Sequence, residues 1–265
     1  MDIVQSNEAF KTVGGKFQFQ YVAVIVRYNG SLYTAKWAHR TQQPSEFSQL
    51  DDIKPIITED RGPIVETAWQ IGPADGCYFK TPSLSAYTSN VDLEGRISRE
   101  IETCEILRKN PHRNIASYLG CREIRGRVSG LCFKHYKSTL LDRVNPQHLN
   151  KRAFLSSNRH RVNRQLEFRL NELHEGIKHL HSLGLVHNDI NPANIMYDED
   201  DTLVLIDFDS CRQVGESLLD TETKRTHGWH DTTVQVASVE NDLAAFQELR
   251  IWLFGSAANE YLFRS

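Results

Sequence analysis

The chain has 265 residues, of which 40% are hydrophobic and 25% charged, so it is long enough to bury a core in one or two domains. Its formal net charge of -3 gives no electrostatic footprint for nucleic acid or membrane surfaces, and we expect neither as a partner. The longest aliphatic run, residues 22–26, is far shorter than the about 20 residues that span a bilayer, and the first residues lack the pattern of a signal peptide. Together with five cysteines that form no C-x-x-C pair, this predicts an intracellular protein, cytoplasmic or nuclear, with free thiols.

The first part of the chain favours β structure. Residues 16–28 and 31–38 flank Asn29-Gly30, a pair typical of two-residue type I′ turns, and predict a hairpin. Further strands are expected at residues 53–60, 63–71 and 76–82. A helix is expected from Ser98 to Asn110, ended by Pro111, and a second strand pair over residues 115–136 turns at Arg125-Gly126.

The second half favours helices. Residues 145–164 are polar and predict a solvated connector. A long amphipathic helix ending near Gly184 is predicted by apolar residues at alternating spacings of four and three, namely Leu166, Leu170, Leu173, Ile177 and Leu180. Another helix is expected to begin near Asn241. Strands with one helix, followed by a mostly helical half, indicate a two-lobed α+β protein.

One stretch concentrates the polar residues that suggest chemistry. Residues 184–211 read GLVHNDINPANIMYDEDDTLVLIDFDSC. Asp189 follows a strand-like segment, Asn194 opens the next segment, and the polar reversal at residues 198–201 returns a strand that would deliver Asp207 beside Asn194. An amide oxygen and a carboxylate are hard ligands that suit Mg²⁺, and a second carboxylate can deprotonate an attacking hydroxyl. This pattern indicates phosphoryl transfer.

The motifs HNDINPAN and LVLIDFD resemble the catalytic loop and the metal-binding motif of eukaryotic protein kinases. The resemblance extends from Ile53 to the C-terminus and is similar in character to divergent kinase-like proteins of filamentous fungi. It implies an α+β, two-lobed protein kinase-like fold. The domains expected are an N-terminal β-hairpin extension at residues 1–52, an N-lobe at 53–137, and a shortened helical C-lobe at 138–265.

The resemblance implies a role for each matching residue in the C-lobe. Asp189 matches the catalytic base, and Asn194 and Asp207 match the two magnesium ligands. Thr226 resembles the threonine that supports the catalytic aspartate in serine/threonine kinases. His187 matches a position that is generally structural.

In the N-lobe, Lys80 resembles the lysine that contacts the phosphates of ATP, and Lys36 is a weaker candidate. The acidic partner of Lys80 would be Glu100, Glu102 or Glu105. We choose Glu102 because Ile106 then lies one turn further along the helix. ATP and Mg²⁺ are therefore the expected cofactors.

The sequence also departs from the family pattern. The segment expected in place of the glycine-rich phosphate loop holds one glycine, Gly62, and the catalytic loop has Asn188 where an arginine is usual. Asn191 replaces a lysine. Asp209 replaces the glycine of Asp-Phe-Gly, which should restrict flipping of that motif. A solvent-facing acid is expected at Asp209, with contact to the metal as the alternative. Few residues follow Asp242, so a shortened lobe should expose Trp252, Leu253 and Phe254 unless a partner covers them.

Three functions remain open from the sequence. The leading one is an ATP- and Mg²⁺-dependent phosphotransferase resembling serine/threonine protein kinases, with an unidentified substrate. An inactive or weakly active pseudokinase would use the same fold as a binding module. A kinase of small hydroxyl compounds, resembling choline and aminoglycoside kinases, would share the two motifs.

Overall fold

A computed structural model describes residues 1–58, 61–87, 92–219 and 223–263. The chain divides into two compact units, each considered by itself. The first unit comprises Met1–Arg61 and Pro82–Leu93, and the second comprises Gly62–Thr81 and Glu94–Ser265.

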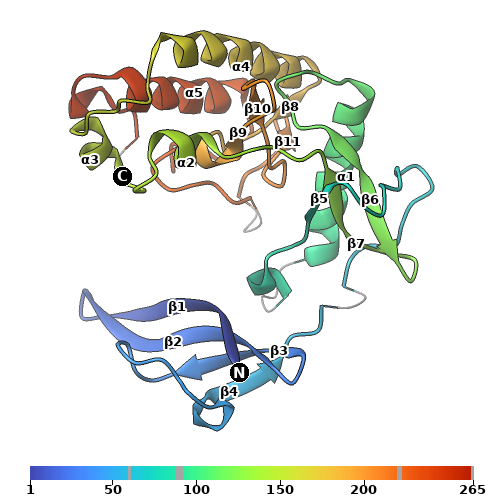
Figure 1. Cartoon of the computed structure of the whole chain (residues 1–265), viewed down its shortest axis with the longest axis vertical. Helices are drawn as coiled ribbons and strands as arrows, with labels where there is room; N and C mark the ends of the chain where they lie inside the picture. The colour runs from blue at the N-terminus through green and yellow to red at the C-terminus, as the bar shows by residue number, and fades with distance from the viewer. Residues whose placement is uncertain (59–60, 88–91, 220–222, 264–265) are drawn as a thin grey trace. The chain divides into compact units, whose positions relative to one another are not determined.

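The first unit contains an antiparallel four-stranded sheet in the order β1-β2-β3-β4 (Figure 1). Its elements are β1 (Asp2–Val13), β2 (Lys16–Tyr28), β3 (Ser31–Trp37), β4 (Asp51–Pro55) and the 3₁₀ helices η1 (Phe47–Gln49) and η2 (Leu84–Tyr87). The predicted hairpin is confirmed, because Asn29 and Gly30 both have positive φ values, 49° and 80°, as a type I′ turn requires. A small core of Val24, Val26, Ala35 and Leu50 lies on one face of the sheet.

The expected first strand of the N-lobe belongs to this sheet. β4 pairs with β3 through Tyr33↔Pro55 and Thr34↔Lys54, and it spans the boundary expected between residues 52 and 53. Residues 59 and 60, at the end of the expected strand 53–60, lie outside the described residues. β4 joins this sheet because β3 provides hydrogen-bond partners for its backbone groups. The local sequence of a strand does not reveal which other strand it will pair with.

The second unit begins with a three-stranded antiparallel sheet in the order β5-β7-β6. Its elements are β5 (Tyr78–Lys80), α1 (Leu93–Lys109), β6 (Tyr118–Ile124) and β7 (Arg127–Phe133). The β6–β7 hairpin turns at Arg125-Gly126, as predicted. The helix begins at Leu93, five positions before the expected start at Ser98.

The segment expected as a strand at residues 63–71 makes only isolated bridges along this hairpin. Ile64 bridges to Arg127, and Ile71 bridges to Cys121. The approach is close at Gly120, which has a φ of +130° and where a Cβ would lie 2.4 Å from the backbone nitrogen of Gly72. A larger residue would push this segment off β6.

The remaining elements of the second unit form a helical layer with two short sheets. They are α2 (Leu140–Val144), α3 (Lys151–Leu155), α4 (Arg164–Ser182), β8 (Leu185–Val186), η3 (Pro192–Asn194), β9 (Ile195–Tyr197), β10 (Leu203–Leu205), β11 (Arg212–Gln213), α5 (Val239–Phe254) and η4 (Ala258–Glu260). β9 pairs with β10, and β8 pairs with β11. In Figure 1 the long helices α4 and α5 run side by side. The predicted stripe of α4 is buried, whereas residues 145–164 contain α3 rather than only a connector.

The apolar end of α5 is covered by the chain itself. Trp252 is 2% exposed and stacks on Phe154 of α3 with ring centroids 4.3 Å apart, and Leu253 is buried as well. Arg159 donates to the carbonyl oxygens of Leu253 and Gly255 at 2.9 and 3.0 Å, closing the C-terminal end of the helix. The exposure expected unless something packs there therefore does not occur at Trp252 and Leu253, because α3 packs on Trp252, and Phe254 is half-buried.

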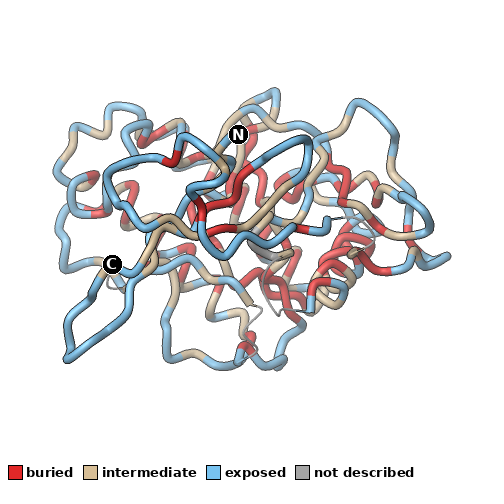
Figure 2. Tube along the Cα trace, turned by 90° about the horizontal axis from the view of Figure 1, so that it is seen from below, coloured by how far each residue is buried: buried red, intermediate tan, exposed pale blue. Residues whose placement is uncertain are grey.

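Buried positions are drawn red in Figure 2, and in the second unit they include the apolar stripe of α4 and all of β10. All five cysteines are free thiols, as expected. Among the residues that the structure describes, no helix is both long and apolar enough to cross a membrane.

Candidate active site

The loop that carries Asp189 is fixed from beneath by a buried carboxylate. Asp242 of α5 is 0% exposed and accepts hydrogen bonds from the backbone N–H groups of His187 and Asn188, each at 2.8 Å. Asn188 has a φ of +63°, a conformation that asparagine tolerates better than most residues. β8 precedes this loop and η3 follows it, so regular structure on both sides positions Asp189.

Asp189 receives hydrogen bonds from two other predicted site residues. Its Oδ1 accepts from the backbone N–H of Thr226 at 2.8 Å. Its Oδ2 accepts from the Thr226 hydroxyl at 3.1 Å and from the Asn194 amide at 2.9 Å. Burial raises the pKa of Asp189 above its ordinary value, while the hydrogen bonds from Thr226 act in the opposite direction.

The hairpin of β9 and β10 brings Asn194 and Asp207 together, as the sequence predicted. The backbone N–H of Ile206 donates to the carbonyl oxygen of Asn194 at 3.0 Å. The next residue, Asp207, has a φ of +66° and leaves the strand direction. The two side chains therefore lie at the same end of the hairpin as Asp189.

The free oxygens of this pair suit a magnesium ion. The amide nitrogen of Asn194 is committed to Asp189, and within the described ranges no hydrogen bond ends on Oδ1 of Asn194 or Oδ2 of Asp207. The same ranges contain no group of three or more His, Cys, Asp or Glu side chains arranged to hold a metal. Mg²⁺ typically takes only one or two protein oxygens and completes its shell with water and phosphate, so the donor set fits this ion.

Lys80 lies between two carboxylates. Its Nζ is 2.5 Å from Oε1 of Glu100 and also pairs with Oδ1 of Asp207. Although burial favours the neutral amine, these two carboxylates raise the pKa of Lys80 above its usual range. Burial alone would raise the pKa of Asp207, but Lys80 lowers it below its ordinary value. Both groups are therefore charged at neutral pH.

The partner of Lys80 is Glu100, so the choice of Glu102 is wrong. Two positions along an α-helix correspond to a rotation of about 200°, which points Glu102 away from Lys80. Glu100 is buried, and Glu102 is exposed. The weaker lysine candidate, Lys36, pairs with Asp52 in the first unit.

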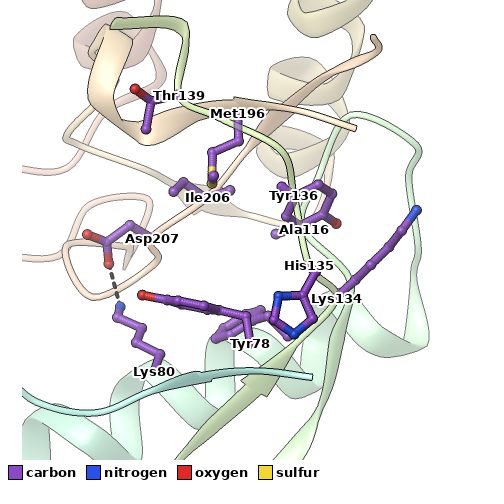
Figure 3. A pocket seen from close by; sticks show the side chains of 11 residues that line it. Tyr78, Lys80, Ala116, Lys134, His135, Tyr136, Thr139, Met196, Ile206 and Asp207 are labelled. Atoms are coloured by element: carbon purple, nitrogen blue, oxygen red, sulfur yellow. Dashed lines mark hydrogen bonds and ion pairs between the residues drawn. The ribbon is translucent and has the colours of Figure 1, made fainter. Parts of the chain in front are cut away.

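A cavity of about 290 Å³ opens beside Lys80 and Asp207. Figure 3 shows Met196 and Ile206 along one wall, Tyr78 on another, and the Lys80–Asp207 contact at one end. The remaining lining residues are Ala116, Phe133, Lys134, His135, Tyr136 and Thr139. Within the described ranges, no backbone hydrogen bond uses the N–H of His135 or Tyr136. An apolar cavity with a few polar groups at its edge is a typical small-molecule site.

The positions that depart from the kinase pattern have their own partners. Asn188 is buried and donates from its amide to the carbonyl oxygens of Val186 and Ser210. Asn191 donates to the Thr226 hydroxyl at 3.0 Å. Gly62 packs against β7, where a Cβ would lie 1.8 Å from the carbonyl oxygen of Val128. His187 donates from Nε2 to the carbonyl oxygen of Ile206 at 3.0 Å, in keeping with a structural position.

Two contacts of the site were missed from the sequence, the pairing of Lys80 with Glu100 and that of Asp209 with Arg96. Asp209 does not face solvent alone, because its Oδ2 lies 3.5 Å from Nη2 of Arg96 on α1. Arg96 is four residues before Glu100, so the correct choice of helix face would have predicted both contacts.

Comparisons with known proteins agree with this geometry. The sequence profile of the protein kinase domain matches residues 79–232, which is more than half of the chain. The chain is 26% identical over 164 residues to serine/threonine-protein kinase SMU1 of Mycosarcoma maydis, covering 61% of this chain and 19% of that protein. It is also similar to two proteins named stress-activated protein kinase JNK. The one from Drosophila melanogaster is 46% identical over 44 residues (17% of this chain, 12% of that protein), and the one from Suberites domuncula is 40% identical over 54 residues (20% and 15%).

The chain thus spans less than a fifth of the length of these curated relatives. Its second unit nevertheless contains the lysine–glutamate pair, the Asp189 loop and the Asn194–Asp207 hairpin within or directly beside the matched region. The chain belongs to the protein kinase domain family.

Proposed function

We propose that this chain is an ATP- and Mg²⁺-dependent phosphotransferase that transfers a phosphoryl group to a hydroxyl, resembling serine/threonine protein kinases. The observation that carries the proposal is that Lys80 and Asp207 pair at one cavity, while the β9–β10 hairpin holds Asn194, and through it Asp189, at the same end of the hairpin as Asp207. A structural hairpin needs no such arrangement, whereas phosphoryl transfer needs a cation, a metal and a base around one phosphate.

Each residue has a defined task in this proposal. Asn194 and Asp207 would hold Mg²⁺ through the oxygens that no described donor uses. When bound, Mg·ATP supplies the transferable phosphoryl group and a cation that offsets its negative charge. Lys80 keeps its positive charge because Glu100 and Asp207 flank it, so it can attract the phosphates of the nucleotide.

Asp189 is the proposed base. It would accept the proton of the substrate hydroxyl while the hydroxyl oxygen bonds to the γ-phosphorus and the bond from that phosphorus to the bridging oxygen breaks, so that ADP leaves. Thr226 and Asn194 orient its carboxylate through hydrogen bonds of 2.8 to 3.1 Å. The contact with Thr226 supports serine or threonine side chains as the acceptor class, in line with the resemblance to serine/threonine kinases.

Two backbone N–H groups that no described acceptor uses support a purine ligand. They belong to His135 and Tyr136, which lie two and three residues after the end of β7 and line the apolar cavity. A purine ring has acceptors that match backbone N–H groups, and its faces would contact the apolar walls around Met196 and Phe133.

A second candidate is a nucleotide-binding module that transfers phosphate slowly or not at all. It is favoured by the position of residues 63–72, which pair along the β6–β7 hairpin instead of forming a strand pair with a phosphate-binding loop. In the described part of this segment, the N–H groups of Val65 and Gly72 donate to the β6–β7 hairpin and cannot cradle phosphates.

Transfer of labelled phosphate from ATP would distinguish these functions. The acceptors should be generic protein substrates and, separately, choline and an aminoglycoside. We expect Mg²⁺-dependent transfer to protein hydroxyls that falls at least about 100-fold in Asp189→Asn, because general-base catalysis contributes about 10²–10⁴-fold. Asp200→Asn, in the exposed turn between β9 and β10, is the matched control and should retain activity. Nucleotide binding without transfer to any acceptor would instead support the binding module.

A further inference from the structure

The metal-binding loop carries a second carboxylate that the proposed function does not use. Asp209 stands two residues after Asp207, and its Oδ1 accepts a hydrogen bond from the hydroxyl of Ser210 at 3.2 Å. Its Oδ2 lies 3.5 Å from Nη2 of Arg96. The side chains of Arg96 and Asp209 are only 14% and 22% exposed, so the pair is partly shielded from water.

The backbone does not explain why a charged residue stands here. Within the loop Asp207, not Asp209, adopts a positive φ. The position of Asp209 therefore does not require glycine, and an aspartate causes no backbone strain there. What an aspartate adds is a negative charge next to the residue that would hold the metal.

Arg96 and Glu100 act from one face of α1. They are four residues apart, and side chains at this spacing lie one above the other on a helix. Glu100 contacts Lys80, which contacts Asp207, while Arg96 contacts Asp209. Ion pairs thus connect α1 to both aspartates of the Asp-Phe-Asp motif, to Asp207 through Lys80 and to Asp209 directly.

Asp209 lies near other carboxylates, so its negative charge needs a neighbouring cation to offset it. Negative groups nearby are Glu100 and Asp207, which act together with Asp209 on the charge of Lys80. Lys80 is already engaged by two carboxylates, and Arg212 donates to the backbone carbonyl of Asp209 at 3.3 Å and forms an ion pair with Glu216. Arg96 is therefore the cation that offsets the Asp209 charge among the described ion pairs.

We infer that Arg96 and Asp209 form a positioning pair that fastens α1 to the metal-binding loop and cancels a carboxylate that would otherwise repel the phosphates of the nucleotide. This inference rests on the proposed function. The catalytic loop has Asn188 in place of the usual arginine. The Arg96–Asp209 ion pair would hold α1 against the metal-binding loop with charges that the sequence already carries, and not with the charge of an added phosphate group.

The test is nucleotide binding in a charge cycle, measured by isothermal titration with Mg·ATP on the full chain. Arg96→Met keeps the aliphatic stem and removes the charge, and we expect it to raise Kd about tenfold, which corresponds to about 1.4 kcal/mol. Arg96→Lys should stay within about threefold of wild type. Adding Asp209→Asn to Arg96→Met should restore Kd to within about threefold, because the unpaired carboxylate is gone. The defect of Arg96→Met should also shrink at high ionic strength.

Lys109→Met is the matched control. Lys109 is an exposed cation at the last position of the same helix. Its substitution therefore removes one positive charge from α1 at a distance from the metal-binding loop. Its Kd should equal that of wild type. A Kd for Arg96→Met equal to that of Lys109→Met, or a defect that Asp209→Asn does not rescue, would overturn the inference while leaving the proposed function intact.

The same variants without nucleotide separate this inference from the proposed function. A double-mutant cycle on thermal unfolding of the nucleotide-free protein should give non-additive effects for Arg96→Met and Asp209→Asn. Additive effects would overturn the ion pair. Absence of Mg·ATP binding by the wild type would contradict the proposed function and, with it, the role of the pair in nucleotide binding.

Discussion

A buried lysine on α3 offers the sharpest stability prediction. Lys151 Nζ donates to the carbonyl oxygen of Gly228 and to the carboxylate of Glu248, whose side chain is 0% exposed. The ammonium also lies 4.4 Å from the centroid of Trp229. The pair therefore joins α3 and α5 to the segment that follows Thr226. We consider the substitution Lys151→Met, which preserves the stem and removes the charge.

The cost follows from what remains after the substitution. Glu248 keeps a hydrogen bond from the backbone N–H of Leu262 at 2.7 Å but loses its only cationic partner among the described residues. Removing one partner of a buried ion pair costs about 3–5 kcal/mol, because the other charge stays buried and uncompensated. At about 2–4 °C per kcal/mol for a chain of this size, Tm should fall by roughly 6–20 °C.

Thermal unfolding followed by circular dichroism measures this effect. The matched control is Lys178→Met, which breaks the exposed pair with Glu175 on α4 and should change Tm by about 2 °C or less. In Lys151→Met/Glu248→Met both charges are removed, so most of the lost stability should return. A Tm for Lys151→Met equal to that of Lys178→Met would refute the reasoning that this buried pair holds the lobe together.

Two further predictions concern the active site. Glu100→Gln should lower kcat/KM at least about tenfold because Lys80 loses one of its two carboxylates, whereas Glu102→Gln on the opposite face should stay within about twofold; equal effects in a steady-state assay would contradict the assigned pairing. Thr226→Val removes a hydroxyl that donates to the ionised form of Asp189 at 3.1 Å, so the pKa of Asp189 should rise and the acid limb of the kcat/KM profile should move to higher pH by about half a unit to one unit. Thr226→Ser keeps the donor and should leave the limb in place, and a shift to lower pH in Thr226→Val would contradict this sign.

The sequence predicted the parts of the site whose chemistry is local. Asp189, Asn194 and Asp207 lie within one loop and one short hairpin, so their spacing was enough to bring them together. Thr226 was placed by resemblance, and it contacts Asp189 as expected. The hairpin turns at Asn29-Gly30 and Arg125-Gly126 were also local, since both contain a glycine, which adopts positive φ without strain, and Asn29 tolerates positive φ as well.

The features that were missed depend on which side of a helix faces its neighbour, or on contacts between residues far apart in the sequence. Glu102 was chosen over Glu100 because Ile106 lies one turn further along, but this spacing does not determine which side of the helix faces Lys80, and Lys80 pairs with Glu100. The cover of Trp252 by Phe154 joins residues almost a hundred positions apart. A polar segment such as 145–164 gives no local signal that one buried aromatic within it completes a core.

The Mg·ATP site is the central claim, and thermal unfolding with and without Mg·ATP tests it most directly. Ligand at 100 times its Kd stabilises a protein by about 2.7 kcal/mol, which should raise Tm by roughly 5–11 °C for a chain of this size. We predict that the rise requires Mg²⁺, persists in Asp200→Asn, and is lost in Asp207→Asn. No rise at millimolar Mg·ATP in the wild type, or an equal rise in Asp207→Asn, would contradict a magnesium–nucleotide site at Asn194 and Asp207.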